Sequence, residues 1–375
     1  MTPLAGCGTI RGVNDAQASR RRFLVRAAAS GAALGLGRGE AVAGPSAGGE
    51  SRRLELPGFV DLQVNGFAGV DFGDPAVTLD DVRRAVAAIE KTGVTRFLPT
   101  LITSSLEAFT ACARSFVRTG HPAIAGIHME GPYISPEDGP RGAHAREHVR
   151  GADVDDFRRR QDAAEGHVRI VTLAPEAPGA IPLIEHLVSG GVRVAIGHTA
   201  ADRAQIQDAV AAGATLSTHL GNGCAGTLPR HPNLIWEQLA EDRLLASLIV
   251  DGHHLPEATV RSMVRAKTPA RTILVTDAMA AAGMPPGVYT LGGQKVELDR
   301  AGRVAAPGAS NLAGSALTLP VAIGNAVRFT GLSLEDVIPM ATTRPAEYIG
   351  IRPTGIVVAD WDAEAMTLRV VRVTA

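Results

Sequence analysis

Eight short apolar runs, separated by stretches of helical length, constrain the fold of this chain more than any other feature. Such runs are short enough to be buried parallel strands, and parallel strands need a crossover connection that is usually a helix. Eight alternations within roughly 220 residues are typical of a closed (β/α)8 barrel of the TIM type. An open doubly wound α/β sheet is the alternative, but no G-x-G-x-x-G motif opens a first helix, so we expect the barrel. The expected strands are Phe59–Val64, Thr95–Leu98, Ala123–Met129, Val168–Leu173, Val192–Ile196, Ala214–Ser217, Leu245–Val250 and Thr272–Thr276.

The segments around these strands predict helices and a small second domain. Only Arg52–Leu56 precedes the barrel, and Gly355–Val373 follows it, with strand-like alternation over Met366–Val373. We therefore expect a small, reduced β-sandwich formed by the segments that flank the barrel. The expected domains are a signal peptide (1–43), a linker with a short β segment (44–56), the barrel (57–352) and a C-terminal β segment (353–375). The expected helices are Leu79–Thr92, Leu106–Thr119, Ala180–Ser189, Asp202–Ala212, Pro256–Ala266, Ser315–Thr330 and Ser333–Thr342, the last with Ser333 as its N-cap.

Size and charge narrow the classes of partner. The chain has 375 residues, of which 45% are hydrophobic and 20% charged, and this composition is typical of a globular protein with a large core. With a net charge of −1, the chain has no overall positive charge that would attract nucleic acid. We expect no stable membrane association and a small-molecule substrate. The three cysteines form no C-x-x-C pair, so neither a thiolate metal site nor a disulfide framework is expected.

The first residues resemble an export signal rather than part of a fold. Ser19–Leu24 has the pattern of a twin-arginine signal, and it is followed by the apolar, Ala/Gly-rich run Val25–Gly37 and an A-x-A cleavage pattern at Ala41–Ala43. A chance basic cluster is the alternative, but the other two elements would then also be accidental. We expect export by the twin-arginine pathway to the periplasm or the cell exterior, or a cytoplasmic protein if the signal is inert.

Three side chains at the ends of expected strands predict a metal site. His198 and His219 each follow an apolar run directly, and Glu130 leaves another run just before a Gly-Pro turn. In a β/α barrel the carboxyl ends of the strands are where active sites are built. Two imidazoles and one carboxylate, with a fourth position open for water, are the ligands of a catalytic zinc. Strand-capping histidines and a glutamate with a basic partner are the alternative, but the combination favours one divalent metal ion, with zinc as the expected ion.

Asp277 directly follows the eighth expected strand, and His253 and His254 follow the seventh. An aspartate that faces a metal-activated water can accept its proton and pass it to a leaving group. Asp277 could instead be the N-cap of a following helix. Together with three metal ligands, the position favours the proton-transfer role, and one of the two histidines is expected to face the substrate.

Eight motifs follow one another between Pro57 and Ile351: PGFVDLQVNG, HMEGPYIS with GAH, GHT, THLGNG, DGHH, VTDAM, LAGSALT and MATTRPA. In this order they resemble the N-acetylglucosamine-6-phosphate deacetylase branch of the metal-dependent amidohydrolase superfamily. The resemblance implies that Glu130, His198 and His219 are the metal ligands and that Asp277 is the general base and then the general acid. The substrate contacts that it implies are Ala143, His144, Asn222, Gly223, Arg230, His254, Leu312, Ala313 and Gly314.

Two departures from the family pattern bear on the site. Gln63 and Asn65 occupy the positions where the superfamily often has an HxH pair that binds a second metal. Neutral amides are poor zinc ligands, so we expect one metal ion per chain. The loop GNGCAGTLPRHPN after His219 also differs around Arg230, the arginine that in the family reaches the sugar phosphate, often across a dimer interface. The resemblance implies a homodimer.

The resemblance implies hydrolysis of N-acetylglucosamine 6-phosphate to glucosamine 6-phosphate and acetate. In that reaction Asp277 would accept the water proton and later protonate the amine, while His144 or His254 stabilises the oxyanion. One alternative is an amidohydrolase that acts on an unphosphorylated N-acyl amino sugar or a cyclic amide. A second is an exported, non-catalytic sugar-binding protein. Phosphorylated sugars are made inside the cell, so either the export signal is inert or the substrate lacks phosphate.

Overall fold

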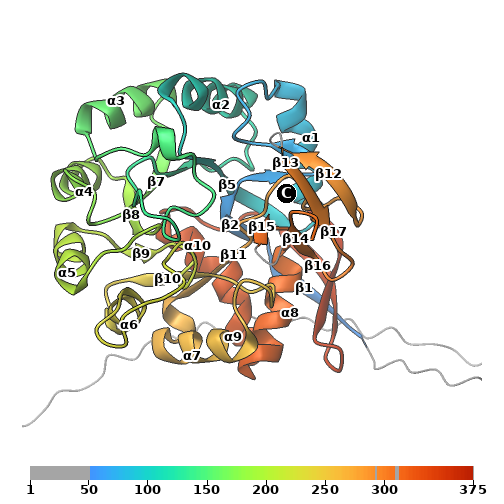
Figure 1. Cartoon of the computed structure of the whole chain (residues 1–375). Helices are drawn as coiled ribbons and strands as arrows, with labels where there is room; N and C mark the ends of the chain where they lie inside the picture. The colour runs from blue at the N-terminus through green and yellow to red at the C-terminus, as the bar shows by residue number, and fades with distance from the viewer. Residues whose placement is uncertain (1–50, 292–293, 309–311, 375) are drawn as a thin grey trace, which may run out of the picture.

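The protein, described here as a computed structural model, is built around an eight-stranded parallel sheet that curls into a barrel (Figure 1). The structure describes residues 51–291, 294–308 and 312–374, so the expected export signal lies outside the described residues. The sheet contains all eight expected strands, in the order β11-β10-β9-β8-β7-β6-β5-β2. These strands are β2 (Phe59–Val64), β5 (Val94–Ile102), β6 (Ile127–Glu130), β7 (Val168–Leu173), β8 (Arg193–Ile196), β9 (Leu216–Ser217), β10 (Leu245–Ile249) and β11 (Thr272–Val275).

The barrel closes between β2 and the residues that follow β11. Val64 and Ala278 form an isolated parallel bridge, and the backbone N–H of Asp277 donates to the carbonyl of Gln63 at 2.9 Å. The backbone N–H of Asn65 donates to the carbonyl of Ala278 at 2.7 Å. The first and last strands of the barrel are therefore joined at their carboxyl ends, where Asn65 and Asp277 lie.

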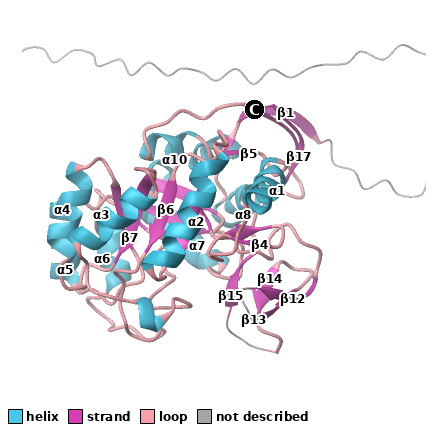
Figure 2. Ribbon diagram, turned by 90° about the horizontal axis from the view of Figure 1, so that it is seen from above, coloured by secondary structure: helices cyan, strands magenta, loops and turns pink. Residues whose placement is uncertain are grey.

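Helices surround the barrel (Figure 2), and α2 (Leu106–Thr119) shows how an apolar face packs a helix against it. In α2 the buried residues Phe109, Cys112, Ala113 and Phe116 recur with helical spacing, and the Ser105 side chain caps the first turn. No helix in the described part of the chain is both long and apolar enough to span a bilayer. The other helices are α1 (Leu79–Glu90), α3 (Val154–Ala163), α4 (Ala180–Ser189), α5 (Arg203–Ala212), α6 (Leu234–Ala240), α7 (Glu257–Lys267), α8 (Leu319–Thr330), α9 (Leu334–Val337) and α10 (Thr343–Tyr348), with 3-10 turns η1 (Arg146–His148), η2 (Pro269–Arg271) and η3 (Ile338–Ala341).

The expected helices after the eighth strand need two corrections. The helix predicted to begin at Ser315 begins at Leu319 as α8, because Ser315 ends a strand instead. The helix predicted over Ser333–Thr342 is the short helix α9, capped by the Ser333 side chain as expected, followed by the 3-10 turn η3. Pro339, inside η3, lacks the N–H that a continuing α-helix would need.

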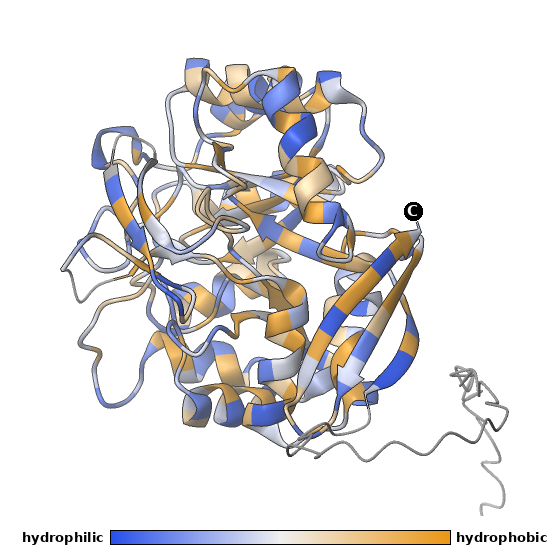
Figure 3. Cartoon of the chain, turned by 90° about the vertical axis from the view of Figure 1, so that its right-hand side faces the viewer, coloured by the Kyte–Doolittle hydropathy of each residue, from blue (hydrophilic) through white to orange (hydrophobic). Residues whose placement is uncertain are grey.

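The segments that flank the barrel form one three-stranded antiparallel sheet. In it β16 (Ile356–Asp362) pairs with β1 (Arg52–Pro57) on one side and with β17 (Thr367–Thr374) on the other. Hydrophobic and hydrophilic residues alternate along the strand that runs to the C-terminus (Figure 3). The sheet packs beside α8.

A second, four-stranded antiparallel sheet lies between β11 and α8 in the sequence and was not predicted. It has its own small core, made by Ala281, Val296, Leu298 and Val304. Alternating residues on both sides of a Gly-Gly pair were a usable hairpin signal. Its strands are β12 (Gly287–Leu291), β13 (Gln294–Leu298), β14 (Arg303–Ala305) and β15 (Leu312–Ser315), and a two-stranded pair, β3 (Gly66–Phe67) with β4 (Val70–Asp71), faces the barrel rim.

Candidate active site

Three of the polar residues expected at the barrel mouth have an unusual backbone conformation. Glu130 ends β6, and His198, His219 and Asp277 follow β8, β9 and β11 by two residues each. His198, His219 and Asp277 have φ values of 50°, 30° and 49°. Residues other than glycine rarely adopt this left-handed region, which costs about 1–3 kcal/mol each and is concentrated at functional sites. The chain therefore turns sharply at three points of the rim, after β8, β9 and β11.

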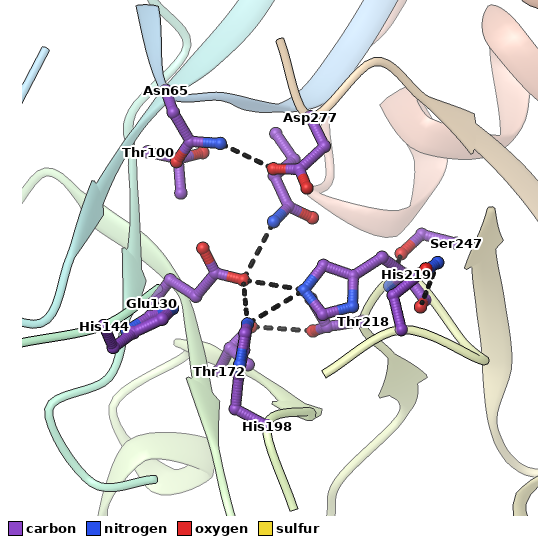
Figure 4. A network of polar contacts seen from close by, with 12 residues as sticks. Asn65, Thr100, Glu130, His144, Thr172, His198, Thr218, His219, Ser247 and Asp277 are labelled. Carbon is purple, nitrogen blue, oxygen red and sulfur yellow. Dashed lines mark hydrogen bonds and ion pairs between the residues drawn. The ribbon is translucent and has the colours of Figure 1, made fainter. Parts of the chain in front are cut away.

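Glu130, His198 and His219 converge on one point (Figure 4). Oε1 of Glu130 lies 3.2 Å from Nε2 of His198 and 3.0 Å from Nε2 of His219, and the two nitrogens are 3.0 Å apart. All three side chains are buried. Ligands about 2.0–2.1 Å from a tetrahedral zinc ion would be about 3.3 Å apart. The three atoms thus have nearly the spacing of one face of a metal site.

The tautomer of His198 also favours a cation at this site. Nδ1 of His198 lies 2.8 Å from the carbonyl oxygen of Pro140 and must donate to it. In the neutral ring, Nε2 of His198 therefore faces the Glu130 carboxylate with a lone pair, an arrangement that is repulsive without a cation or a proton between them. Burial opposes the charge of Glu130, but the adjacent imidazoles of His198 and His219 hold the pKa of Glu130 well below its ordinary value. Burial likewise opposes a charge on His219, yet Glu130 raises the pKa of His219.

His144 is a second candidate for the third ligand, because its ring also lies near Glu130 and His198. However, the backbone N–H of Thr103 donates to Nδ1 of His144 at 3.4 Å, and the Thr103 hydroxyl lies 2.7 Å from the same atom. Because Nδ1 accepts, the proton of the neutral ring is on Nε2, which is then a donor and not a metal ligand. Burial lowers the pKa of His144 to about 3, so the ring stays neutral. The spacing and the tautomer both favour His219 over His144 as the ligand.

Asp277 lies beside this cluster, with Asn65 as its hydrogen-bond partner. Nδ2 of Asn65 donates to Oδ1 of Asp277 at 2.5 Å. Burial, and then the negative charge of Glu130, raise the pKa of Asp277 to about 6. No helix follows Asp277 directly, since the chain continues through turns to β12, so the helix-cap alternative is wrong.

Gln63 has a role that the sequence did not reveal. Nε2 of Gln63 donates to Oε1 of Glu130 at 2.9 Å, the same oxygen that faces the two imidazoles. Gln63 and Asn65 were expected only to be non-ligands, and the structure brings each into contact with a charged residue of the site. Nothing local in the sequence signals these contacts, because the partners are far apart along the chain.

The expected substrate contacts other than Arg230 lie around the same mouth. His254 is held by Asp251, whose Oδ2 accepts from Nδ1 of His254 at 2.6 Å, so that Nε2 is left for other partners. A Cβ at Gly223 would lie 2.9 Å from Nδ1 of His198, so only glycine fits against the imidazoles. Asn222 donates to the carbonyl of His219 at 3.2 Å. Ala143 is exposed next to His144, and Leu312, Ala313 and Gly314 lie in β15, which bridges to Ala278 through Ser315.

Arg230 is not part of this cluster. It is exposed in the loop before α6, and no ion pair of its guanidinium is found within the described part of the chain. The loop contributes to a pocket of about 270 Å³ lined by Leu228, Pro229 and Pro232 together with Ala201 and Asp202. Within one protomer, the structure does not bring Arg230 to the metal-site residues.

Comparison with known proteins gives consistent matches. The model of the amidohydrolase family matches residues 55–368. The chain is 38% identical over 318 residues to a human N-acetylglucosamine-6-phosphate deacetylase, covering 80% of this chain and 75% of that protein. It is 36% identical over 303 residues to an N-acetylgalactosamine-6-phosphate deacetylase from Escherichia coli O157:H7, covering 80% and 78%. The crystal structure of N-acetyl-D-glucosamine-6-phosphate deacetylase from Mycobacterium smegmatis superposes with a TM-score of 0.78 at 34% identity, over 90% of each chain.

Proposed function

Because the chain belongs to the amidohydrolase family, we propose that it is a metal-dependent deacetylase of a phosphorylated amino sugar, with N-acetylglucosamine 6-phosphate as the substrate. The observation that carries this proposal is the convergence of two histidine Nε2 atoms on one oxygen of Glu130, beside a carboxylate with a raised pKa. A non-catalytic sugar-binding protein would need neither feature.

The residues present fit a divalent cation held by Glu130, His198 and His219, and we propose zinc. When bound, the cation would polarise the amide carbonyl and lower the pKa of water. Asp277 accepts the proton of the attacking water and delivers it to the nitrogen of the departing amine. His144 donates from Nε2 to the oxyanion that develops on the carbonyl oxygen. The products are acetate and the free amino sugar.

The phosphate end of the substrate needs a cationic partner. We propose a homodimer in which the Arg230 guanidinium of one protomer reaches the phosphate bound by its partner. A guanidinium suits this role because it donates two parallel, charge-assisted hydrogen bonds to a phosphate. The exposure of Arg230 and the absence of an ion pair for it in the described chain support the proposal.

Rates of acetate release from N-acetylglucosamine 6-phosphate, N-acetylgalactosamine 6-phosphate and N-acetylglucosamine test this function. We expect the purified protein to prefer the first sugar, and Arg230→Ala to lower kcat/KM about ten- to a hundredfold for the phosphorylated sugars only, because one charge-assisted contact is lost. Arg203→Ala, which removes another exposed arginine near α6, is the matched control. Equal losses on all three sugars would refute the phosphate contact, and release from none of them would refute the deacetylase.

We also propose export by the twin-arginine pathway, on the basis of Ser19–Leu24 and Ala41–Ala43. Export would require that the phosphorylated substrate be met outside the cytoplasm. Cell fractionation and N-terminal sequencing should give a mature chain that begins near Gly44. A full-length protein confined to the cytoplasm would show that the signal is inert.

A further inference from the structure

We propose that the end of β2 positions the two carboxylates of the site: Gln63, in β2, holds the metal ligand Glu130, and Asn65, directly after β2, holds the proton acceptor Asp277. This inference rests on the proposed function, since it assigns roles within that site. Neither amide touches the substrate in this account. Each acts through the carboxylate to which it donates.

Gln63 contacts Oε1 of Glu130, the carboxylate oxygen that faces the two imidazoles. Nε2 of Gln63 and both histidine Nε2 atoms lie around Oε1 of Glu130, at 2.9, 3.2 and 3.0 Å. Gln63 is buried on β2, so its amide is held in one orientation by the surrounding barrel. A fixed donor restrains the rotation of the Glu130 carboxylate, and partners of metal ligands are known to change affinity by about 10–100-fold.

Two contacts hold Asp277, one from Asn65 and one to Gln63. The side-chain amide of Asn65 holds Oδ1 of Asp277 at 2.5 Å, and the backbone N–H of Asp277 donates to the carbonyl of Gln63. One carboxylate oxygen of Asp277 is therefore engaged, and the other is left for proton transfer. Among the described residues, the buried carbonyl oxygen Oδ1 of Asn65 has no hydrogen-bond partner. Such an atom costs free energy, so the amide of Asn65 is a poor choice for stability alone.

The neutrality of the amide group explains why an amide, rather than a charged donor, suits positions 63 and 65. A carboxylate held by arginine or lysine would have its charge neutralised, and it would bind a cation or a proton more weakly. A neutral donor fixes the carboxylate and leaves most of its charge available. The two amides, at positions 63 and 65, therefore restrain two carboxylates without neutralising the charge of either.

The test uses Gln63→Met and Asn65→Leu, which keep the approximate shape of the side chain but remove its hydrogen-bond donor. Gln63→Ala and Asn65→Ala replace them if either variant fails to fold. We expect the Gln63 variants to bind metal about 10–100-fold more weakly in competition with a chelator. We expect the Asn65 variants to keep metal affinity and KM while kcat falls about 10–100-fold, because the base is misplaced. Gln238→Met is the matched control, since Gln238 is a buried amide in α6 that donates only within its own helix.

Unchanged metal affinity in the Gln63 variants, or unchanged kcat in the Asn65 variants, would overturn the inference. A loss of thermal stability without these changes, equal to that of Gln238→Met, would likewise identify the amides as packing residues only. Failure of the proposed function would look different, because the wild-type protein would then release no acetate. In that case metal affinity of the Gln63 variants still decides whether the amide positions Glu130.

Discussion

Asp277→Asn is expected to lower kcat by about 10⁴-fold while the fold and the metal content are retained. The reason is that one carboxylate serves both proton transfers, each of which contributes about 10²–10⁴-fold. Asparagine tolerates the left-handed conformation that Asp277 adopts, at φ 49°, so the backbone need not change. Steady-state kinetics with the phosphorylated sugar, together with melting temperature and elemental analysis, measure the three quantities.

The pH profile provides an internal check on this role. Burial and the charge of Glu130 raise the pKa of Asp277 to about 6, and a bound cation would lower it. A base works when deprotonated, so kcat/KM of the wild type should fall as pH drops through a value at or below about 6. Asp360→Asn, which alters a buried aspartate of the flanking sheet, should leave kcat and the profile unchanged. Wild-type activity in Asp277→Asn would contradict the proton-transfer role.

Glu130→Gln is expected to remove most of the bound metal and to lower kcat/KM by at least about 10³-fold. The substitution keeps the shape of the side chain but removes the negative charge that faces the two imidazoles, and neutral amides are poor ligands beside imidazole. Elemental analysis of protein purified without added metal should give about one equivalent for the wild type and a small fraction of that for the variant.

Two observations would count against this prediction. Two equivalents of metal in the wild type would mean that Gln63 and Asn65 do not exclude a second ion. Full metal content in Glu130→Gln would mean that Glu130 is not a ligand. Glu241→Gln is the control for the same chemical change, because Glu241 pairs with Arg243 at the surface, away from the barrel mouth.

The barrel could be predicted because its determinants are local. Each strand is a short apolar run, and apolar residues recur with helical spacing in the helices, as in α2. Eight repeats of this pattern therefore identify the fold without knowledge of any contact. The same logic placed Glu130, His198 and Asp277 at strand ends and hence at one rim of the barrel. The flanking strand β17 could also be predicted, because apolar and polar residues alternate along it.

Contacts between distant residues could not be predicted in this way. The donation from Gln63 to Glu130 spans 67 positions and that from Asn65 to Asp277 spans 212, so no local pattern encodes either. The tautomer of His144 depends on the backbone of Thr103, which lies 41 positions away. The Asp251–His254 pair, by contrast, joins residues that are three positions apart.

The most direct test of the account is an anomalous diffraction map of crystals grown with zinc, measured on both sides of the zinc absorption edge. The account predicts one peak per chain, about 2.0–2.2 Å from Nε2 of His198, Nε2 of His219 and a carboxylate oxygen of Glu130. A peak bound by His144 in place of His219, or no peak between these side chains, would contradict it.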